Sequence, residues 1–289
     1  MLRVGMIGAE NSHTAAIARV LNVDKKIPGV RATHVWGETR AYAKAAAERG
    51  EIPTIVRKAE EMIGEVDAVV IDHRHGRDHL PAAMPFLETR VPLFIDKPFC
   101  YRRAEGRKFL ARAKELKVPV CSFSTLPKQA SFKQLKKDVA KLGRLYTVVS
   151  TGPCDIKSKW GGIFFYGIHQ VDMILRLTGY DFYRTQIVKG QGQNHSANIL
   201  FRSGTVGTMN CVGEGSTPFH MSIVGEKGRI DRQIVSDESM YLNGIKDFVR
   251  MFKTGKTDET YETMLGPVAV LESLEKSVAK PQDRVGAGL

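Results

Sequence analysis

The sequence has few cysteines and lacks a long apolar run. Its 289 residues include four cysteines, which lie far apart and form no Cys-x-x-Cys pair. This spacing argues against a zinc ribbon or a disulfide scaffold and fits a reducing compartment. No apolar stretch approaches the roughly 18 residues that a membrane-spanning helix needs, and the first residues read directly into a strand rather than a signal peptide. We therefore expect a cytoplasmic protein without a membrane segment.

Local clustering of charge is also missing, although the chain is basic as a whole. Lysine and arginine number 43 against 31 acidic residues, which gives a net charge of +12. The excess is even, with 21 basic and 15 acidic residues up to residue 120, and 22 and 16 after it. Nucleic-acid-binding proteins gather basic side chains into one patch beside aromatic residues. The charge favours attraction of anionic small molecules instead, and we expect no nucleic-acid partner.

The length suits two domains, at roughly 100–200 residues each. Up to residue 123, apolar strand-like segments alternate with helical ones. The expected strands are Leu2–Ile7, Val30–Trp36, Asp67–Ile71, Val91–Ile95 and Val118–Phe123. Strands that are separated by helices predict a doubly wound parallel sheet of the Rossmann type.

After residue 124 the expected strands follow one another with short turns between them. They are Tyr146–Ser150, Gln186–Val188, Ser196–Phe201, Thr205–Cys211, His220–Val224 and Arg229–Gln233, with helices at about Phe132–Leu142, Phe165–Leu177, Met240–Thr254 and Met264–Ser277. Such succession predicts an open, largely antiparallel sheet. The sequence therefore predicts an α/β protein, with a dinucleotide-binding Rossmann domain over residues 1–123 and a substrate-binding and oligomerisation α+β domain over residues 124–289.

The turn after the first expected strand is a candidate dinucleotide site. Gly8 ends the strand, and Asn11 or Ser12 is suited to cap the helix that follows. Free backbone N–H groups and the helix dipole at such a turn attract a diphosphate. The fingerprint G-x-G-x-x-G is incomplete, because Glu10 and His13 stand at its second and third glycines. An ordinary strand-to-helix turn is therefore an alternative interpretation.

Polar residues follow two further expected strands. Glu38 stands where an acidic residue binds a ribose hydroxyl, but Arg40 nearby would suit the 2′-phosphate of NADP, so both cofactors stay open. The segment Asp72–His79 holds three histidines and two aspartates at a strand end. It could bind a metal, contact a cofactor or substrate, or form a solvated loop. Its two arginines disfavour a metal ion, so we expect none.

Two candidate catalytic segments remain. Asp96-Lys97-Pro98 follows the fourth expected strand, where a lysine can hydrogen-bond a substrate hydroxyl, although a surface lysine before a proline turn would give the same pattern. In the second domain, Tyr166 and His169 share one helix face at about 100° per residue. A packed core face would show the same pattern.

Together these motifs resemble those of the Gfo/Idh/MocA family, which includes glucose–fructose oxidoreductase and inositol dehydrogenase. The resemblance rests on the turn at Gly5–Gly8, on Asp96-Lys97-Pro98, and on Gly167-Ile168-His169 followed by Asp172. It implies a Rossmann domain that binds NAD or NADP and a second domain whose open sheet commonly forms the oligomer interface. We therefore expect a homodimer or homotetramer that associates through the C-terminal sheet.

The resemblance also implies reversible oxidation of a hydroxyl on a polyhydroxylated small molecule, such as a sugar, a cyclitol or a sugar acid. Lys97 and His169 fall on the family's motif lysine and histidine. We expect His169 to be the general base, Lys97 to stabilise the alkoxide, and Tyr166 to be a secondary candidate for proton transfer. The expected cofactor contacts are Gly8, Ala9, Glu10, Asn11, Ser12, His13, Glu38, His73, His79, Asp96 and Lys97.

Two departures from the family pattern define alternatives. The family often carries an aspartate four residues before the histidine, where this chain has Phe165, and Glu10 replaces a fingerprint glycine. A catalytically silent binding or regulatory protein on the same fold is therefore a second hypothesis. A lyase or glycosidase that uses tightly held NAD transiently is a third.

Overall fold

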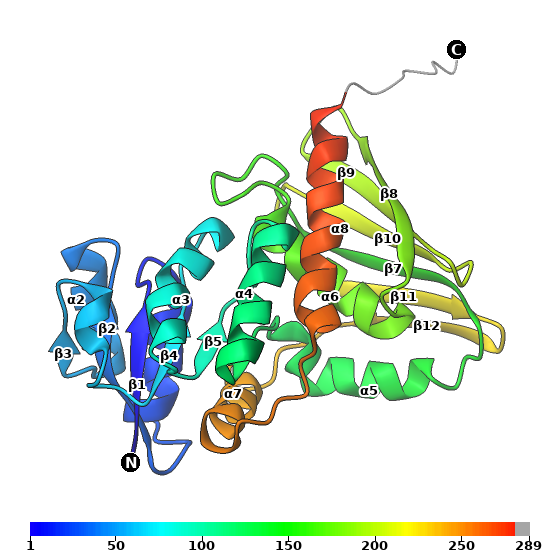
Figure 1. Cartoon of the computed structure of the whole chain (residues 1–289). Helices are drawn as coiled ribbons and strands as arrows, with labels where there is room; N and C mark the ends of the chain where they lie inside the picture. The colour runs from blue at the N-terminus through cyan, green and yellow to red at the C-terminus, as the bar shows by residue number, and fades with distance from the viewer. Residues whose placement is uncertain (281–289) are drawn as a thin grey trace.

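The computed structural model describes residues 1–280 and arranges them around two six-stranded sheets (Figure 1). The strand order is β3-β2-β1-β4-β5-β6 in the first sheet and β12-β11-β7-β10-β9-β8 in the second. The two sheets lie at opposite ends of the molecule, with helices between them (Figure 1). This arrangement confirms the expected α/β class with a Rossmann sheet followed by a largely antiparallel one.

All strand pairs of the first sheet are parallel. Its strands are β1 (Leu2–Ile7), β2 (Val30–Trp36), β3 (Thr54–Ile55), β4 (Ala68–Ile71), β5 (Leu93–Ile95) and β6 (Val120–Cys121). Its helices are α1 (Ser12–Ala18), α2 (Arg40–Gly50), α3 (His79–Glu88) and α4 (Arg103–Leu116). Every residue of β4 is buried because helices cover both faces, which explains its unbroken apolar sequence.

The second sheet buries one face only. Its strands are β7 (Leu145–Pro153), β8 (Phe182–Lys189), β9 (Asn194–Phe201), β10 (Val206–Val212), β11 (His220–Gly225) and β12 (Gly228–Gln233), and β7 with β10 is the parallel pair among them. Helices α5 (Ala130–Val139), α6 (Phe164–Thr178) and α8 (Tyr261–Ala279) pack on this sheet. Alternate residues such as Val148, Ile199 and Met209 are buried beneath them, as period-two patterning requires.

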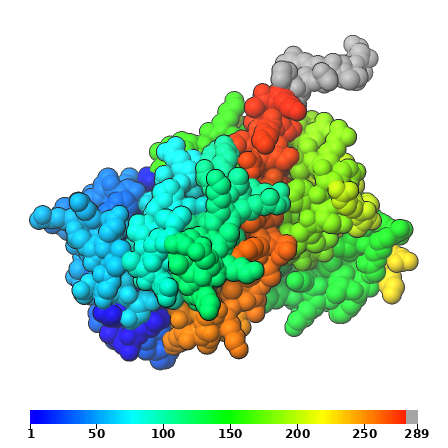
Figure 2. All heavy atoms as spheres, viewed as in Figure 1, coloured from blue at the N-terminus to red at the C-terminus, as the bar shows by residue number. Residues whose placement is uncertain are grey.

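Helix α7 (Leu242–Thr254) comes late in the sequence but packs against the first sheet. Its Phe248 is buried and stacks on Phe94 of β5, with ring centroids 4.5 Å apart. In the space-filling view, this helix (orange) lies against the blue and cyan part of the chain (Figure 2). The chain therefore returns to the Rossmann domain after β12, and α8 leads it back. The expected boundary between two domains, after residue 123, stays a prediction.

All four cysteines are free and buried, and burial raises the pKa of the Cys100 thiol to about 12. Across residues 1–280, no helix is both long enough and apolar enough to span a lipid bilayer.

Candidate functional site

The turn between β1 and α1 is built around Gly8. This residue has a φ of +98°, and a side chain there would lie 2.7 Å from the backbone of Asp72 and His73. Glycine is therefore required at this close approach. The Asn11 side chain caps α1 by accepting a hydrogen bond from the N–H of His13 at 3.4 Å, and Ser12 is the first residue of the helix.

Glu38 follows β2 and faces this turn. Its Oε2 accepts hydrogen bonds from the N–H groups of Ala9 and Glu10, at 2.9 Å each. Its Oε1 is buried and has no hydrogen-bond partner within residues 1–280. The Glu10 carboxylate points elsewhere, toward the hydroxyl of Tyr42 at 3.5 Å. Because a buried oxygen without a donor is costly, Oε1 marks a place that a ribose hydroxyl would fit.

A cavity of about 350 Å³ lies at the same edge of the first sheet. Its lining residues are Ile7, Trp36, Arg57, Lys58, Ala59, Glu60, His73, Pro81 and Ala82. His73 is buried with its ring 5.7 Å from that of Trp36, and its Nδ1 is another buried atom without a partner in the described chain. Burial lowers the pKa of His73, so its ring is neutral. The glycine turn, the open Glu38 oxygen and this cavity fit the adenosine half of a dinucleotide.

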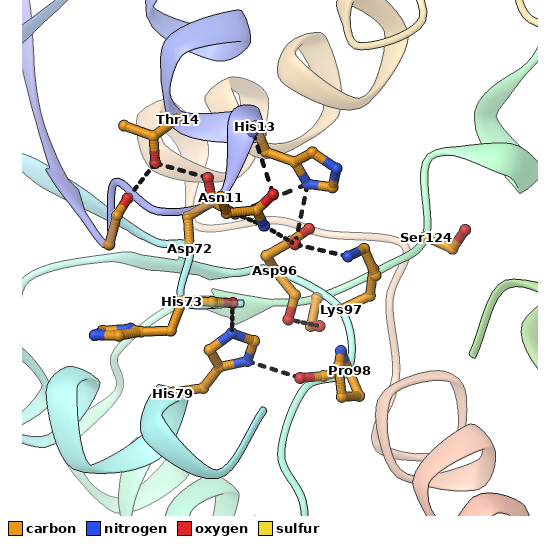
Figure 3. A network of polar contacts seen from close by, with 12 residues as sticks. Asn11, His13, Thr14, Asp72, His73, His79, Asp96, Lys97, Pro98 and Ser124 are labelled. Carbon is orange, nitrogen blue, oxygen red and sulfur yellow. Dashed lines mark hydrogen bonds and ion pairs between the residues drawn. The ribbon is translucent and has the colours of Figure 1, made fainter. Parts of the chain in front are cut away.

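Two buried carboxylates, those of Asp72 and Asp96, lie together at the ends of β4 and β5 (Figure 3). The Asn11 amide donates to Asp72 Oδ1 at 2.8 Å and to Asp96 Oδ2 at 3.3 Å. The Thr14 hydroxyl lies 2.7 Å from Asp72 Oδ2. Burial, and then the charge of Asp96, raise the pKa of Asp72 well above its usual value. Asp96 is therefore the carboxylate of the pair that carries the negative charge.

Asp96 in turn holds two basic side chains. Its Oδ2 lies 3.3 Å from Lys97 Nζ and 3.1 Å from His13 Nδ1 (Figure 3). Burial works to raise the pKa of Asp96, but the charges of Lys97 and His13 outweigh it and hold the pKa below its usual range. Because Lys97 is only 7% exposed, this ion pair fixes its ammonium at the carboxyl edge of the parallel sheet.

His13, Asp72 and Asp96 also present metal-ligand atoms within 4.8 Å of one another. Their oxygens, however, already face the Asn11 amide, the Thr14 hydroxyl and the Lys97 ammonium. A metal ion would have to displace these donors and lie close to an ammonium. The donor set favours a hydrogen-bonded network over a metal centre.

His79 ties the segment Asp72–His79 to the turn that carries Lys97. Its ring is fully buried, with Nδ1 2.7 Å from the carbonyl oxygen of Pro98 and Nε2 2.8 Å from that of His73 (Figure 3). Burial lowers its pKa. We expected His79 to contact the cofactor. Such a contact would require one of these ring nitrogens to lose its contact with a carbonyl oxygen.

On the other side of the site, α6 carries His169. Its Nδ1 lies 2.7 Å from the hydroxyl of Ser124. Burial, and then the charges of Lys97 and His13, lower the pKa of His169 well below its usual value. The imidazole is therefore neutral near pH 7 and can accept a proton. Lys97 and Ser124 line the same small cavity, and Ser124 contacts His169, so the amine and the imidazole belong to one site.

Aromatic side chains of α6 surround these two groups. The Phe165 ring lies 5.8 Å from Lys97 Nζ and 5.0 Å from the Tyr166 ring. The Tyr166 ring lies 5.8 Å from that of His169, and its side chain is 42% exposed. Tyr166 is therefore accessible from solvent beside His169, whereas Phe165 supplies no group that could take a proton.

Several residues of this network were not among the expected site residues. Asp72 and Thr14 hold the glycine turn, and Ser124 holds His169. Asp172 accepts a hydrogen bond from the N–H of Ser124 at 3.3 Å and pairs with Arg176 at 2.8 Å. Asp72 and Ser124 both follow strands of the parallel sheet, and this position in the sequence is the signal that could have identified them.

Comparison with known proteins agrees with this geometry. Residues 2–123 match the family described as "Oxidoreductase family, NAD-binding Rossmann fold". Over these residues the chain is similar to the Gfo/Idh/MocA family. This match covers the Rossmann sheet, the glycine turn and Lys97, and it indicates an oxidoreductase that binds NAD or NADP.

Solved structures extend the likeness over nearly the whole chain. Scyllo-inositol dehydrogenase from Lactobacillus casei, with NAD(H) and scyllo-inositol, has a TM-score of 0.83 at 15% identity, covering 96% of both chains. Myo-inositol 2-dehydrogenase from Lactobacillus plantarum has a TM-score of 0.82 at 16% identity, also covering 96% of both chains. At such identities the likeness shows the shared fold alone. A sequence comparison with curated proteins finds no match.

Proposed function

We propose that this dehydrogenase transfers a hydride between nicotinamide and a hydroxyl-bearing carbon of a sugar, a cyclitol or a sugar acid. The observation that carries the proposal is the cavity that Lys97 and Ser124 line together, because the Ser124 hydroxyl lies 2.7 Å from His169 Nδ1 and so places the imidazole beside the ammonium. Oxidising a secondary alcohol requires a base for the hydroxyl proton and a positive group beside the oxygen. The inositol dehydrogenases of the same fold act on cyclitols, which supports this substrate class.

Each residue then has a defined task. NAD(P) supplies the hydride acceptor when it is bound. Lys97 hydrogen-bonds the substrate oxygen and stabilises its developing charge. When His169 Nδ1–H donates to the Ser124 hydroxyl, Nε2 carries the free electron pair that accepts the hydroxyl proton. Tyr166 is the secondary candidate for this proton, because its exposed side chain lies beside the His169 ring.

The cofactor would lie along the carboxyl edge of the Rossmann sheet. We assign the diphosphate to the turn from Gly8 to His13 and a ribose hydroxyl to Glu38 Oε1. A carboxylate at this position favours NAD, because it repels a 2′-phosphate, whereas Arg57 and Lys58 in the cavity would attract one. Titration of the fluorescence of NADH and NADPH with the protein decides between the two cofactors.

The test of the proposal is Lys97→Ala. Turnover should fall by about 10²- to 10⁴-fold, because the developing alkoxide loses its positive partner. NADH affinity should change little, because the adenosine cavity lies on the other side of β4. Lys108→Ala, on the exposed face of α4, is the matched control and should behave as the wild type. Near-normal turnover in Lys97→Ala would exclude the assignment.

A second candidate function is cofactor or sugar binding without turnover. Phe165 favours it, because the family's usual aspartate at this position is replaced by a side chain that cannot exchange a proton. NADH binding with no turnover across a panel of sugars, cyclitols and sugar acids would support this candidate over the first.

We also propose that the protein associates through the uncovered face of the second sheet. On that face Ser196, Asn210 and Thr151 lie in one row and are joined by hydrogen bonds of 3.1 Å, and Val188 at the end of the row is exposed. Side chains of neighbouring strands that pair directly point to the same face. Light scattering should give a dimer or tetramer, and Asn210→Arg should dissociate it. A wild-type monomer would contradict the proposal.

The cytoplasm is the compartment that we propose for this protein. Four buried free thiols support it, because disulfides are rare in a reducing compartment. Fractionation of cells that express the untagged chain tests the assignment.

A further inference from the structure

Arg74 follows β4 and carries a charge without a matching acid. No ion pair joins it to an acidic side chain in residues 1–280, and its Nε is buried without a hydrogen-bond partner there. Its guanidinium carbon lies 5.2 Å from the ring centre of Trp160 and 5.6 Å from that of Phe165. Two aromatic rings therefore hold the guanidinium through cation–π contacts and leave its hydrogen-bond donors available.

This guanidinium belongs to the same site as the proposed catalytic groups. The Phe165 ring that it contacts also lies 5.8 Å from Lys97 Nζ. On its other side, Phe165 contacts Tyr166, which contacts His169. A chain of adjacent aromatic side chains thus leads from Arg74 to the base. Arg74 and Lys97 therefore both lie within about 6 Å of the same ring centre.

The charges around Phe165 are unbalanced. Lys97 is paired with Asp96, whereas Lys159 adds a further cation, 4.7 Å from the Trp160 ring. Of the two buried carboxyl groups, Asp72 and Asp96, it is Asp72 whose pKa is raised, so it adds no negative charge to the site. Arg74 thus has no acidic partner within residues 1–280, and an anionic ligand would supply one.

We propose that the substrate carries a carboxylate and that Arg74 binds it. The inference rests on the proposed dehydrogenase function and narrows its substrate to the sugar acids. The planar guanidinium matches a carboxylate with two parallel hydrogen bonds. The half-buried rings of Trp160 and Phe165 offer flat surfaces to the apolar face of a pyranose. Lys97 and His169 then face a hydroxyl at the opposite end of the sugar.

A phosphate ester is the other anion that arginine binds. Phosphate sites characteristically gather backbone N–H groups at a turn or a helix start. Arg74 is flanked instead by two rings, so the surroundings favour the flat carboxylate. The two anions are separated by experiment.

The experiment compares matched ligands on the full-length protein. A panel of pyranoses of different stereochemistry is prepared in three forms: the neutral methyl glycoside, the corresponding uronic acid, and the 6-phosphate. Calorimetry with and without NADH measures affinity, and NAD or NADP reduction measures turnover. For the best uronic acid, Arg74→Gln should weaken binding by about 10- to 100-fold, the usual effect of losing a charge-assisted hydrogen bond. Its neutral partner should bind as before.

Arg77→Gln is the matched control. Arg77 lies three residues away in the same segment, is exposed and pairs with Asp78 at 3.5 Å. It should leave every affinity unchanged, and Arg74→Lys should recover part of the lost binding. Thermal melts establish that each variant is folded. A phosphate that binds more tightly than its matched acid, a panel in which no acid binds better than its neutral partner, or equal losses for acid and neutral forms would each overturn the proposal.

The design separates this inference from the proposed function. Binding of an acid that depends on Arg74, without reduction of either cofactor, would contradict the dehydrogenase and leave the carboxylate site standing. Turnover of neutral sugars that is unaffected by Arg74→Gln would retain the dehydrogenase and remove the carboxylate site.

Discussion

The two sides of the candidate site are built in opposite ways. On the Rossmann side, Lys97 and His13 are joined to Asp96 by short polar contacts and are largely shielded from solvent. On the α6 side, Phe165 and Tyr166 are half-buried or exposed and meet their neighbours through ring contacts. The first arrangement fixes the direction of an ammonium before substrate arrives. The second can adapt to a ligand, so we expect the rings of α6 to fit the shape of the sugar and the Rossmann side to fix the charged groups that the sugar meets.

The strongest test of this contrast concerns His169, the polar residue that α6 contributes. His169→Gln should lower kcat by about 10²- to 10⁴-fold, because the base is lost. Its lowered pKa keeps the wild-type imidazole in the neutral, proton-accepting form below pH 6.5. Wild-type kcat/KM for oxidation should therefore hold down to that pH and fall only as pH drops through the lowered pKa.

His34→Gln on β2 is the control for His169, because His34 lies outside the site. Steady-state rates over the acid range are the measurement. A decline of kcat/KM centred at pH 6.5 or above, which survives in His169→Gln, would assign the titration to another group.

The next test concerns stability on the Rossmann side. Asp96→Asn leaves the buried Lys97 ammonium without its counter-ion and should cost about 3 kcal/mol of unfolding free energy. Asp67→Asn removes an exposed partner of Arg3, and the cost there should be about 0–1 kcal/mol. Chemical denaturation of both variants gives the comparison. Equal losses of unfolding free energy would show that the buried Lys97–Asp96 pair stabilises the fold no more than the exposed Arg3–Asp67 pair does.

Much of this architecture could be predicted from the sequence. Five of the six strands in the first sheet are apolar runs between helices, and Lys97 stands at a strand end. β3 was not expected, because two exposed residues leave no apolar pattern to read. The return of α7 to the first sheet was also missed. Its apolar face fits either domain, and only packing against Phe94 and its neighbours selects one.

The site was harder to predict than the fold. Asp72 and Asp96 are far apart in the sequence and become a pair because β4 and β5 are adjacent in the sheet. Arg74 lies in the segment Asp72–His79, which the sequence alone did not distinguish from a solvated loop. The role that we propose for Arg74 depends on Trp160 and Phe165. These residues lie far along the chain and contact Arg74 only in the folded protein. Spacing within one segment cannot reveal such a contact.

A smaller effect is expected when the α6 side is given the charge that the family usually has there. Phe165→Asp places a carboxylate beside Lys97 and near His169. A nearby negative charge favours the imidazolium, so the pKa of His169 should rise and the pH profile should move upward with it. Phe165→Leu, which removes the ring without adding charge, should leave the profile in place. A profile that moves equally in both variants would indicate repacking rather than charge.

The smallest expected effect concerns the hydroxyl that joins the two sides. Ser124→Ala removes the hydrogen bond to His169 Nδ1, and kcat should fall by roughly 5- to 10-fold, in keeping with about 1 kcal/mol for one such bond. Ser124→Thr retains the hydroxyl and should recover most of the rate. Ser122→Ala serves as the control, because that hydroxyl contacts only the Asp96 carbonyl among the described residues, at 3.4 Å. The measurement is the kcat of all three variants at one pH. If Ser124→Ala matched the wild type, the imidazole would be oriented by its ring neighbours, and even the catalytic residue of α6 would owe its position to aromatic packing.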